Sequence, residues 1–586
     1  MPVNIIGISA FYHDSACCIL QNGQLIAAAE EERFSRIKAD PSVPKYAFRY
    51  CLNEARISMN DVDCVAYYES PRKKLARQLW SGILGSDPSL LKTYQPKMVE
   101  NEIREKTGYQ GPIVFVDHHM SHAASSFFCS GFSESAILTA DGVGEWATTT
   151  YGTGIGNKID LFEEVQFPDS LGLLYSTITS YLGFGVNDGE YKVMGLAPYG
   201  KALYTDKIYE LISSPDKSGQ FSLNMEYFGF LVSSCMYTRE FISLMGRPPR
   251  HDDDPLDQFH MDLAKSMQVV LEEILVQKSF YLHEKTGMEN LCMAGGVALN
   301  CVANGQVLRK GPFKKLYVQP AANDAGGAIG AAIMAHIELT GTRPLTQKLK
   351  HVYLGPSYSS NEVATLLEST GLNYLDLRDQ SDELFRLTAR RIAAGKVIGW
   401  FQGKMEFGPR SLGSRSILAD PRNETMRDRI NAMVKKREGF RPFAPAVRLS
   451  KAKEHFDLDH DSPFMLETCQ VISGMNLPAI THVDGSARVQ TVDDVTNKKF
   501  YSLLKAFDEF TGCPILLNTS FNVKGEPIVC TPEDALRCFI TTDIDCLVIN
   551  DFIIDRDSNG LDMLRYILSR DIPARSGITH DVYTFI

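Results

Sequence analysis

Residues 4–30, NIIGISAFYHDSACCILQNGQLIAAAE, contain two apolar strand-like runs joined by a polar loop, and an Asn-Gly pair then leads into a third run. Asn-Gly between apolar runs predicts a tight hairpin. The same pattern of strand, polar loop, strand, turn and strand recurs over residues 136–164, where the polar loop begins with Asp141 and Gly142. A unit that appears twice predicts a duplicated α/β architecture with a nucleotide cleft between its halves.

The composition is that of a globular protein with more than one domain. The 586 residues are 44% hydrophobic and 22% charged, and the net charge is −11. Acidic character argues against nucleic-acid binding as the main activity, because clustered Lys and Arg hold phosphate backbones. The longest apolar stretch, residues 326–337, is too short to span a bilayer. Thirteen cysteines form no CxxC pair, and no charged-then-apolar leader opens the chain. We therefore expect a soluble cytoplasmic protein with reduced thiols and with no nucleic-acid or membrane partner.

A pair of histidines points to a metal ion. The run VDHHMSH, residues 116–122, sets His118 and His122 four residues apart, ahead of an apolar strand that leads to Asp141. On a helix, residues four apart share one face, so two imidazoles can reach one ion. A second acid, Asp324, ends another strand-like run in QPAANDAGG, residues 319–327. Two imidazoles and two carboxylates at element ends predict a nitrogen–oxygen metal site, with histidines on a helix surface as the alternative.

The rest of the first half alternates strands, glycine turns and helices. Glycines follow strand-like runs near residues 295 and 326, where backbone amides could approach a phosphate. Residues 200–260 lose periodicity, and we interpret them as an insertion near the cleft mouth. Their acidic run, residues 252–254, suits either a cationic ligand or an ordinary solvated surface. Helical spacing returns over residues 256–286 and ends at Gly287. We interpret residues 341–353 as a linker between domains.

Local charge reverses after about residue 354. The loop GKMEFGPRSLGSRS, residues 403–416, carries Arg410, and Asn518 and Ser520 follow an apolar strand over residues 515–517. Cations on loops at strand ends, with hydroxyl and amide donors nearby, predict a site for a phosphate-rich ligand. Ordinary surface charge is the alternative, and it is the preferred interpretation for Lys436 and Arg437.

Four motifs in chain order resemble those of the O-carbamoyltransferases of the nodulation protein U and cephamycin or tobramycin carbamoyltransferase type. These motifs are HHMSH (118–122), GEYKVMGLAP (189–198), GGVALN (295–300) and GPRSLG (408–413). The resemblance covers nearly the whole chain except the insertion at 200–260. It implies an actin-like (ASKHA) carbamoyl-transfer domain over residues 1–345 and a YrdC-like α/β domain over residues 350–586.

The resemblance also implies an activity. The C-terminal domain is expected to activate carbamoyl phosphate with Mg-ATP to give carbamoyladenylate. The N-terminal domain then passes the carbamoyl group to a hydroxyl of a natural product of antibiotic, glycoside or macrolide type. The expected partners are carbamoyl phosphate, ATP and the small-molecule acceptor, and a homodimer is a further expectation.

Site residues follow from the resemblance, position by position. Iron(II) is the expected metal, although zinc and manganese suit the same ligands. His13 matches the catalytic base, a role that suits a loop imidazole titrating near neutral pH. The remaining assignments are metal ligands His118, His122, Asp141 and Asp324; carbamoyladenylate contacts Gly142, Glu190, Lys192, Gly296 and Asn300; carbamoyl phosphate and ATP contacts Lys38, Arg410, Lys435, Arg441, Arg488, Asn518 and Ser520; and acceptor contacts Phe11 and Tyr12.

Two other enzyme classes are open at this point. A small-molecule kinase of the actin-like fold would need strand-end aspartates and glycine turns, but no paired histidines. Threonylcarbamoyl transfer to tRNA uses both folds, but the acidic net charge argues against it. A hydrogenase-maturation carbamoyltransferase would carry CxxC spacing, which this chain lacks.

Overall fold

The computed structural model describes residues 2–81, 96–231, 233–435, 438–561, 564–565 and 568. Contacts divide the chain into two compact units. Unit 1 comprises the described residues of Met1–Ser35 and Ala39–Leu349, and unit 2 comprises Arg36–Lys38 and the described residues of Lys350–Ser576. Within the described ranges, no helix has the length and apolar character needed to cross a membrane. Lys436 and Arg437 lie outside the described residues.

The first sheet of unit 1 has the strand order β3-β2-β1-β4-β5. Asn22 and Gly23 form the turn between β2 and β3 with φ of +52° and +74°, as a two-residue hairpin requires. Strand β1 pairs antiparallel with β2 and parallel with β4, and β4 is parallel to β5. The strands are β1 (Asn4–Ser9), β2 (Ala16–Gln21), β3 (Gln24–Glu30), β4 (Cys64–Tyr67) and β5 (Ile113–Phe115).

The second sheet repeats this topology. Its order is β10-β9-β6-β7-β8. Strand β6 pairs antiparallel with β7 and parallel with β9, and β9 is parallel to β10. Each sheet is thus an antiparallel trio followed by two parallel strands, which confirms the duplication expected from the sequence. The strands are β6 (Glu134–Ala140), β7 (Ala147–Ile155), β8 (Lys158–Gln166), β9 (Asn290–Ala294) and β10 (Lys315–Val318).

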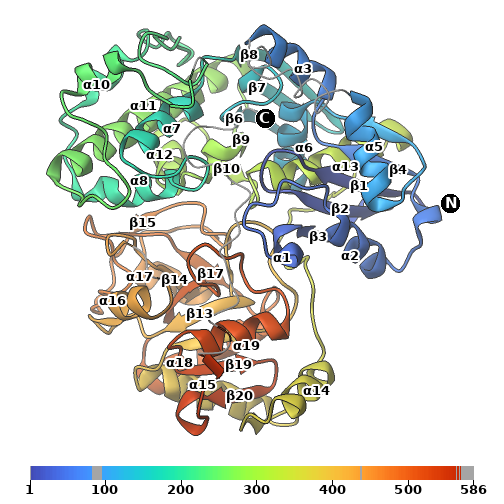
Figure 1. Cartoon of the computed structure of the whole chain (residues 1–586), viewed down its shortest axis with the longest axis vertical. Coiled ribbons are helices and arrows are strands. Elements are labelled where there is room, and N and C mark those ends of the chain that lie inside the picture. Colours follow the sequence, from blue (N-terminus) through green and yellow to red (C-terminus); the bar gives the residue numbers. More distant parts are fainter. Residues whose placement is uncertain are drawn as a thin grey trace. The chain divides into compact units, whose positions relative to one another are not determined.

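Two buried helices, α6 (His118–Ser130) and α13 (Asp324–Thr340), pack against each other in unit 1 (Figure 1). Helix α13 also packs on the first sheet and α6 on the second. A Cβ at Gly330 would lie 1.7 Å from the carbonyl oxygen of Ser121, so only glycine permits this approach. The glycines at 326, 327 and 330 lie inside α13 and allow close packing, whereas the sequence predicted a phosphate-binding turn there.

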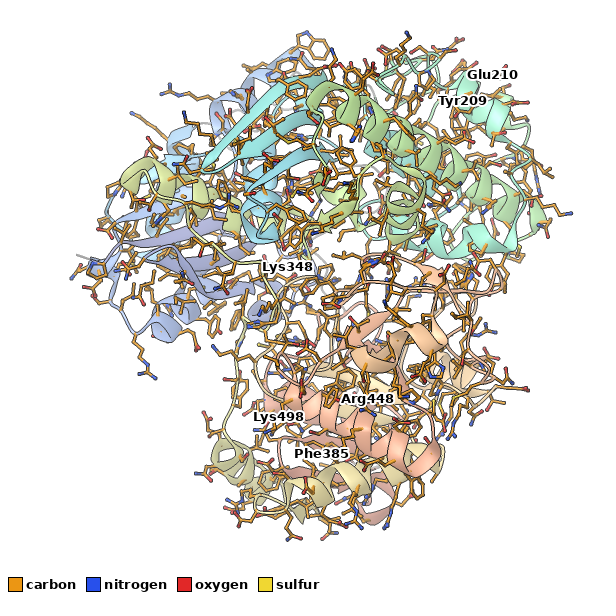
Figure 2. All side chains as sticks on the ribbon, turned by 180° about the vertical axis from the view of Figure 1, so that it is seen from behind. Tyr209, Glu210, Lys348, Phe385, Arg448 and Lys498 are labelled. Atoms are coloured by element: carbon orange, nitrogen blue, oxygen red, sulfur yellow. The ribbon has the colours of Figure 1, made fainter. Side chains whose placement is uncertain are left out.

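The insertion packs along the long helix α11 (Gln258–Thr286), which ends at Gly287 as predicted. The insertion was predicted to be irregular, but it contains the short helices α9 (Thr205–Glu210) and α10 (Arg239–Met245). The Tyr209 hydroxyl of α9, labelled in Figure 2, donates to Glu273 of α11 at 2.7 Å. The acidic residues 252–254 are exposed, in agreement with a solvated surface.

Lys278 of α11 is a lysine buried in the core of unit 1. The residue is only 1% exposed to solvent. The ammonium donates to the Tyr151 hydroxyl at 2.9 Å, and that hydroxyl donates to the Ser218 carbonyl at 2.9 Å. Burial lowers the pKa of Lys278 to about 7, because a charged amine loses hydration in the core.

Replacing Lys278 with methionine should stabilise unit 1 near pH 7. The pKa of this lysine is 10.5 in an ordinary setting and about 7 in the fold. The unfolded chain therefore binds the proton more tightly, and stability falls as pH drops from 10.5 to 7. The effect is on the order of 4–5 kcal/mol at most. Thermal unfolding at pH 7 and pH 9 should show this slope in the wild type and in the control Lys285→Met, but not in Lys278→Met. A methionine variant with the wild-type slope would contradict the assignment.

Unit 2 contains a mixed sheet with the order β11-β20-β19-β12-β13-β18-β14-β17 and a separate antiparallel pair of β15 (Cys469–Gln470) and β16 (Ser486–Ala487). The helix and strand predicted at 382–394 and 397–401 are found as α15 (Ser381–Ala393) and β12 (Ile398–Phe401). Helix α15 packs against α18 (Lys498–Thr511), and Arg448, labelled in Figure 2, pairs with Asp508 of α18 at 2.6 Å. The other strands are β11 (Leu375–Asp376), β13 (Arg415–Ala419), β14 (Ala444–Arg448), β17 (Gln490–Val492), β18 (Ile515–Ser520), β19 (Cys546–Ile549) and β20 (Phe552–Asp555).

Candidate metal centre and phosphate-binding site

Helix α6 begins at the first predicted metal ligand. Asp117 precedes the helix, and Gly131 ends it with a φ of +76°. The Glu145 carboxylate accepts the His118 amide at 2.9 Å and the Ser70 amide at 2.6 Å. A carboxylate at a helix N-terminus satisfies amides that have no partner within the helix, and it complements the helix dipole. Glu145 therefore fixes the start of the helix that carries both histidines.

The four predicted metal ligands lie together. One ligand atom from each of the four comes within 4.8 Å of all the others. The Nε2 atoms of His118 and His122 are 3.1 Å apart. They lie 3.2 and 3.1 Å from Oδ2 of Asp141, and 3.8 and 3.6 Å from Oδ1 of Asp324. All four residues are buried.

This geometry fits a divalent cation. Ligands about 2.1 Å from an ion are about 3.0 Å apart in octahedral geometry and about 3.4 Å apart in tetrahedral geometry. The two histidine nitrogens and the Asp141 oxygen are separated by 3.1–3.2 Å, which falls between these values. Two buried carboxylates also need positive charge beside them. Imidazole and carboxylate together suit iron(II), zinc or manganese, and the donor set does not choose among them.

Replacing Glu145 with glutamine should weaken metal binding by about 10- to 100-fold, the usual cost of losing a group that orients a ligand. The amide removes the charge and one acceptor oxygen from the start of α6. Zinc titration of metal-free protein against a chelating dye would measure the change. Glu134→Gln, at an exposed position at the start of β6, is the matched control. Equal zinc affinity in both variants would contradict the role of Glu145.

Two further side chains, His119 and Tyr68, lie next to the four predicted metal ligands but bond elsewhere or to only one of them. His119 lies between the two ligand histidines, but its Nδ1 is 2.6 Å from Oγ1 of Thr139 and its Nε2 is 2.8 Å from the Ala147 carbonyl. Burial lowers the pKa of His119 to about 3, so its ring is neutral. The Tyr68 hydroxyl donates to Oδ2 of Asp324 at 3.2 Å, which leaves Oδ1 toward the histidines.

The first loop holds His13 beside Asp14. His13 Nδ1 lies 2.7 Å from Asp14 Oδ2, and the Tyr12 ring centroid is 4.1 Å from that of His13. Burial lowers the pKa of His13, but the Asp14 carboxylate raises it. Asp324 and Asp141 raise it further, and the net pKa is about 9. The predicted base thus lies within electrostatic reach of both metal-ligand carboxylates. The other predicted acceptor contact, Phe11, lies 6.2 Å from the Tyr67 ring.

Gly142 and Gly296, two of the predicted carbamoyladenylate contacts, lie beside the four predicted metal ligands. The amides of Gly142 and Gly296 donate to Oδ1 of Asp141 at 2.7 and 3.2 Å. These bonds hold Asp141 so that its other oxygen faces the histidines. A Cβ at Gly296 would come within 3.0 Å of the same carboxylate, so a side chain there would crowd the ligand.

A third predicted carbamoyladenylate contact, Asn300, lies in a polar network beside α11. Asn300 accepts the Ala303 amide at 3.0 Å and donates to Gln268 at 3.0 Å. The Tyr175 hydroxyl also donates to Gln268, at 3.1 Å. The sequence analysis missed Gln268 and Tyr175, because both stand within apolar helical stretches where spacing does not single out a polar residue.

Helix α8 (Glu190–Leu196) carries the two remaining contacts of this group. Glu190 accepts the Ser176 hydroxyl at 2.7 Å and the Asn187 amide at 3.1 Å. Burial raises the pKa of Glu190. Lys192 lies 5.3 Å over the Phe184 ring. The bond to Ser176 connects Glu190 to the middle of α7 (Leu171–Tyr181), the helix that also carries Tyr175.

In unit 2, hydrogen bonds connect Lys435 to Ser520, a second predicted phosphate contact, and Asn518 to the loop that carries Arg410. Strand β18 extends to Ser520, so Asn518 and Ser520 lie on the strand, whereas the sequence analysis placed them after it. The Lys435 ammonium donates to the Ser520 hydroxyl at 3.0 Å and to the Asn522 side chain at 2.8 Å. Asn518 donates to the Ser411 carbonyl at 3.3 Å. These bonds hold the loop 408–413 and Lys435 against β18.

Two buried oxygens at this place lack hydrogen-bond partners among the described residues. They are Oδ1 of Asn518 and Oγ of Ser411. Buried polar atoms are nearly always paired, and these two oxygens could accept hydrogen bonds from a ligand. Arg410 and Arg488 are half-buried on neighbouring loops, and Arg441 pairs with Glu438 at 2.7 Å.

Lys38 groups with unit 2 although it lies early in the chain. The neighbouring Arg36 shows how this segment is held, because its guanidinium donates to the carbonyls of Ile528 and Pro527 at 2.7 and 2.9 Å. The sequence placed Lys38 with the carbamoyl phosphate and ATP contacts, and the structure groups it with the unit that carries the other six.

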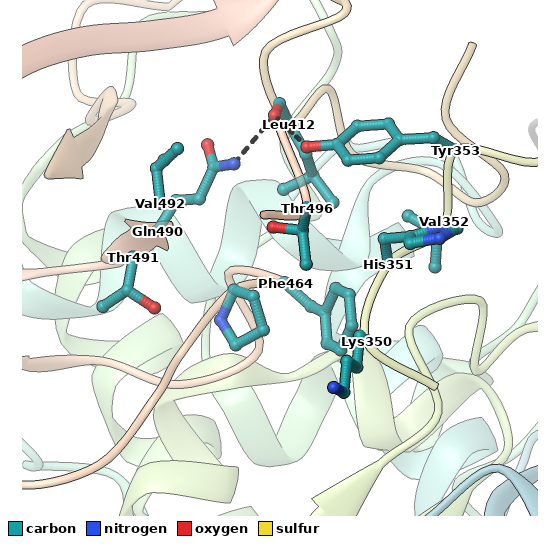
Figure 3. A pocket seen from close by; sticks show the side chains of 11 residues that line it. Lys350, His351, Val352, Tyr353, Leu412, Phe464, Gln490, Thr491, Val492 and Thr496 are labelled. Carbon is teal, nitrogen blue, oxygen red and sulfur yellow. Dashed lines mark hydrogen bonds between the residues drawn. The ribbon is translucent and has the colours of Figure 1, made fainter. Parts of the chain in front are cut away.

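A buried glutamate that the sequence analysis missed shapes the loop around Arg410. Glu406 accepts the amides of Leu412 and Ser414 at 2.6 and 2.8 Å. Figure 3 shows the opposite side of Leu412, whose carbonyl accepts bonds from Gln490 and Tyr353, each at 2.8 Å. These bonds fix the backbone of the loop. A small pocket opens beside it, lined by Lys350, His351, Val352, Tyr353, Leu412, Pro463, Phe464, Gln490, Thr491, Val492 and Thr496.

Comparisons with known proteins give matches along most of the chain. A family described as "Carbamoyltransferase N-terminus" matches residues 4–333, and one described as "Carbamoyltransferase C-terminus" matches residues 389–556. An uncharacterized protein of Synechocystis sp. is 45% identical over 94% of this chain and 96% of its own. Nodulation protein NolNO of Sinorhizobium fredii is 40% identical over 98% of this chain and 84% of its own. The 3'-hydroxymethylcephem-O-carbamoyltransferase of Amycolatopsis lactamdurans is 36% identical over 44% of this chain and 48% of its own.

Proposed function

Because the chain belongs to the carbamoyltransferase family, we propose that it is an ATP-dependent O-carbamoyltransferase that works in two steps, one in each unit. Unit 2, as a YrdC-like domain, makes carbamoyladenylate from carbamoyl phosphate and ATP. Unit 1 transfers the carbamoyl group to a hydroxyl of a small-molecule natural product. The observation that carries this proposal is the buried cluster of two histidines and two aspartates in unit 1.

The first step converts a poor acyl donor into a reactive one. Water splits carbamoyl phosphate into carbamate and phosphate. A carbamate oxygen then attacks the α-phosphorus of ATP, pyrophosphate leaves, and a mixed anhydride with AMP remains. Lys435 and Arg410 supply positive charge for the phosphates. Asn518 and Ser411 offer buried oxygens that can orient the carbamoyl nitrogen by accepting its hydrogens.

The second step moves the carbamoyl group to the acceptor. A cation held beside Asp324 and Asp141 would offset the two carboxylates that help to raise the pKa of His13, and would favour its neutral form. Neutral His13 then takes the proton of the acceptor hydroxyl at Nε2, since Asp14 already accepts the proton on Nδ1. The acceptor oxygen attacks the carbamoyl carbon, and AMP leaves. Gly142 and Gly296 keep Asp141 in place through their amides. When bound by the four ligands, a divalent metal, for which we propose iron(II), supplies positive charge beside the reacting group.

The two alternatives make different products. A small-molecule kinase would leave the metal-ligand cluster of unit 1 without a role. The decisive assay incubates the protein with ATP, carbamoyl phosphate labelled in the carbonyl carbon, and alcohols or tRNA. We expect AMP, pyrophosphate and a labelled carbamate ester of an alcohol. Formation of ADP with a phosphorylated acceptor, or label in tRNA, would overturn the proposal.

A further inference from the structure

The loop between β1 and β2 holds the proposed base in a strained backbone. Phe11 and Asp14, on either side of His13, have φ of +69° and +57°. The left-handed region costs free energy for residues with a side chain, most of all for a bulky one, and such residues persist only where their surroundings hold them. Part of this support is the bond from the Phe11 amide to the Pro41 carbonyl at 2.7 Å. The rest must come from other neighbours of the loop.

A buried ion pair in unit 1 is such a neighbour. Lys74 lies in helix α3 (Pro71–Trp80), and Glu69 lies just before this helix. The two residues are 7% and 4% exposed, and the ammonium of Lys74 is 2.8 Å from Oε1 of Glu69. Lysine and glutamate are almost never buried unless they are paired, and apolar residues in their place are often equally stabilising. The pair therefore calls for a role beyond stability.

The first contact between this pair and the loop runs through Tyr67, the last residue of β4. Its hydroxyl donates to the Ala10 carbonyl at 2.9 Å and lies 3.1 Å from Oε1 of Glu69. A hydroxyl has one hydrogen, so the two oxygens compete for it. An ionised carboxylate is the stronger acceptor, and Glu69 would take the hydrogen if its charge were not neutralised. Lys74 neutralises that charge, which leaves the hydrogen to Ala10, at the start of the loop.

The second contact is made with an aromatic ring of the loop. Nζ of Lys74 lies 5.9 Å from the centroid of the Tyr12 ring. That centroid lies 4.1 Å from the centroid of the His13 ring. A desolvated ammonium attracts the face of an aromatic ring. Lys74 therefore holds Tyr12, and the Tyr12 ring in turn limits where the imidazole of His13 can move.

We infer that Lys74 is a positioning residue for the transfer step in unit 1. Through these two contacts it keeps residues 10–14 in the strained backbone that presents His13 to the acceptor hydroxyl. Lys74 touches no reacting group in this role, so its loss slows proton transfer and leaves acceptor binding nearly unchanged. The inference rests on the proposed function, because His13 acts as the base in that reaction.

Steady-state kinetics with synthetic carbamoyladenylate and an alcohol that the wild type accepts test the inference. Lys74→Met keeps an unbranched side chain and removes the charge. We expect kcat to fall tenfold or more, with KM for the alcohol within threefold, and Lys74→Arg should recover kcat to within threefold of the wild type. The control Arg72→Met, at an exposed position of the same helix, should match the wild type. A wild-type kcat in Lys74→Met, or a loss confined to KM, would overturn the inference.

A double variant shows whether Lys74 acts through His13. Residues that act through one another give non-additive losses. In a His13→Ala background, Lys74→Met should lower transfer by less than a further twofold, and a second tenfold loss would overturn the inference. If Lys74→Met does not fold, Tyr67→Phe removes the hydroxyl of the first contact with little change in shape. It should lower kcat threefold or more, again only where His13 is present, and a wild-type kcat would overturn the inference.

The NMR signal of the His13 ring separates this inference from the proposed function. In zinc-loaded protein with 13C-labelled histidine, this signal is identified by its absence in His13→Ala. Because the Tyr12 ring lies next to the imidazole, Lys74→Met should move the signal, and Arg72→Met should not. A moved signal in a protein that forms no carbamate ester would support the positioning role and reject the proposed transfer. An unmoved signal in a protein that forms the ester would overturn the positioning role alone.

Discussion

Replacing His118 with alanine is expected to abolish carbamoyl transfer while leaving carbamoyl-phosphate-dependent pyrophosphate exchange at the wild-type rate. The Nε2 atom of His118 lies 3.1 Å from that of His122 and 3.2 Å from Asp141, so the variant removes one of four ligand atoms. A cation held by three remaining ligands is bound more weakly and is oriented differently. We expect transfer to fall at least a hundredfold, because charge stabilisation at a reacting centre commonly contributes several kcal/mol.

The control for this variant is His251→Ala, because His251 is an exposed residue of the insertion. Metal content, pyrophosphate exchange and carbamate-ester formation should be measured on both proteins. His251→Ala should match the wild type in all three. If His118→Ala lost exchange together with transfer, the assignment of the two steps to separate units would be wrong.

Replacing Arg410 with alanine is expected to stop both steps, with exchange and transfer each reduced at least a hundredfold. The loop around Arg410 is held from two sides, by Glu406 through the Leu412 amide and by Gln490 through the Leu412 carbonyl. Such a loop presents its arginine in one position, where loss of the guanidinium removes charge from a bound phosphate. Transfer fails as well, because unit 1 then receives no carbamoyladenylate.

Arg386→Ala is the matched control, since Arg386 is a 60% exposed arginine that pairs with Glu383 within α15. Surface pairs of this kind contribute little, so both activities should stay near the wild-type level. Synthetic carbamoyladenylate adds a second measurement. It should restore ester formation in Arg410→Ala and not in His118→Ala. Full exchange activity in Arg410→Ala would remove this arginine from the activation site.

The four residues that could hold a metal ion could be predicted from the sequence because they stand in local patterns. His118 and His122 share a helix face, and Asp141 follows a strand. Glu145 has no such pattern, since its partners are backbone amides at the starts of two helices, 27 and 75 residues away. Gln268 was missed for a related reason, because a polar residue on the buried side of a long helix becomes informative only once its neighbour Asn300 is known.

The glycines of α13 show a different limit of prediction from the sequence. Glycine after a strand suits a phosphate-binding turn and close helix packing equally well, and spacing does not separate the two. In the structure the glycine at 330 lies against the backbone of α6, a contact between segments about two hundred residues apart. The duplicated sheet was predictable because hairpin signals are local. The extension of β18 to Ser520 depends on pairing with β13, which the strand's own sequence does not encode.

The contact between Gly330 and Ser121 has a consequence for how this protein family can diversify. The backbones of α6 and α13 meet without intervening side chains, so the separation between the histidines and Asp324 is set by the main chain. Substitution of core side chains elsewhere should therefore leave the distance between the two histidines and Asp324 unchanged. Substitutions on the surrounding loops and helix ends can accumulate without changing this separation. A change in the ion that these four residues would hold, by contrast, calls for substitutions in the four residues or in groups that position them, such as Glu145.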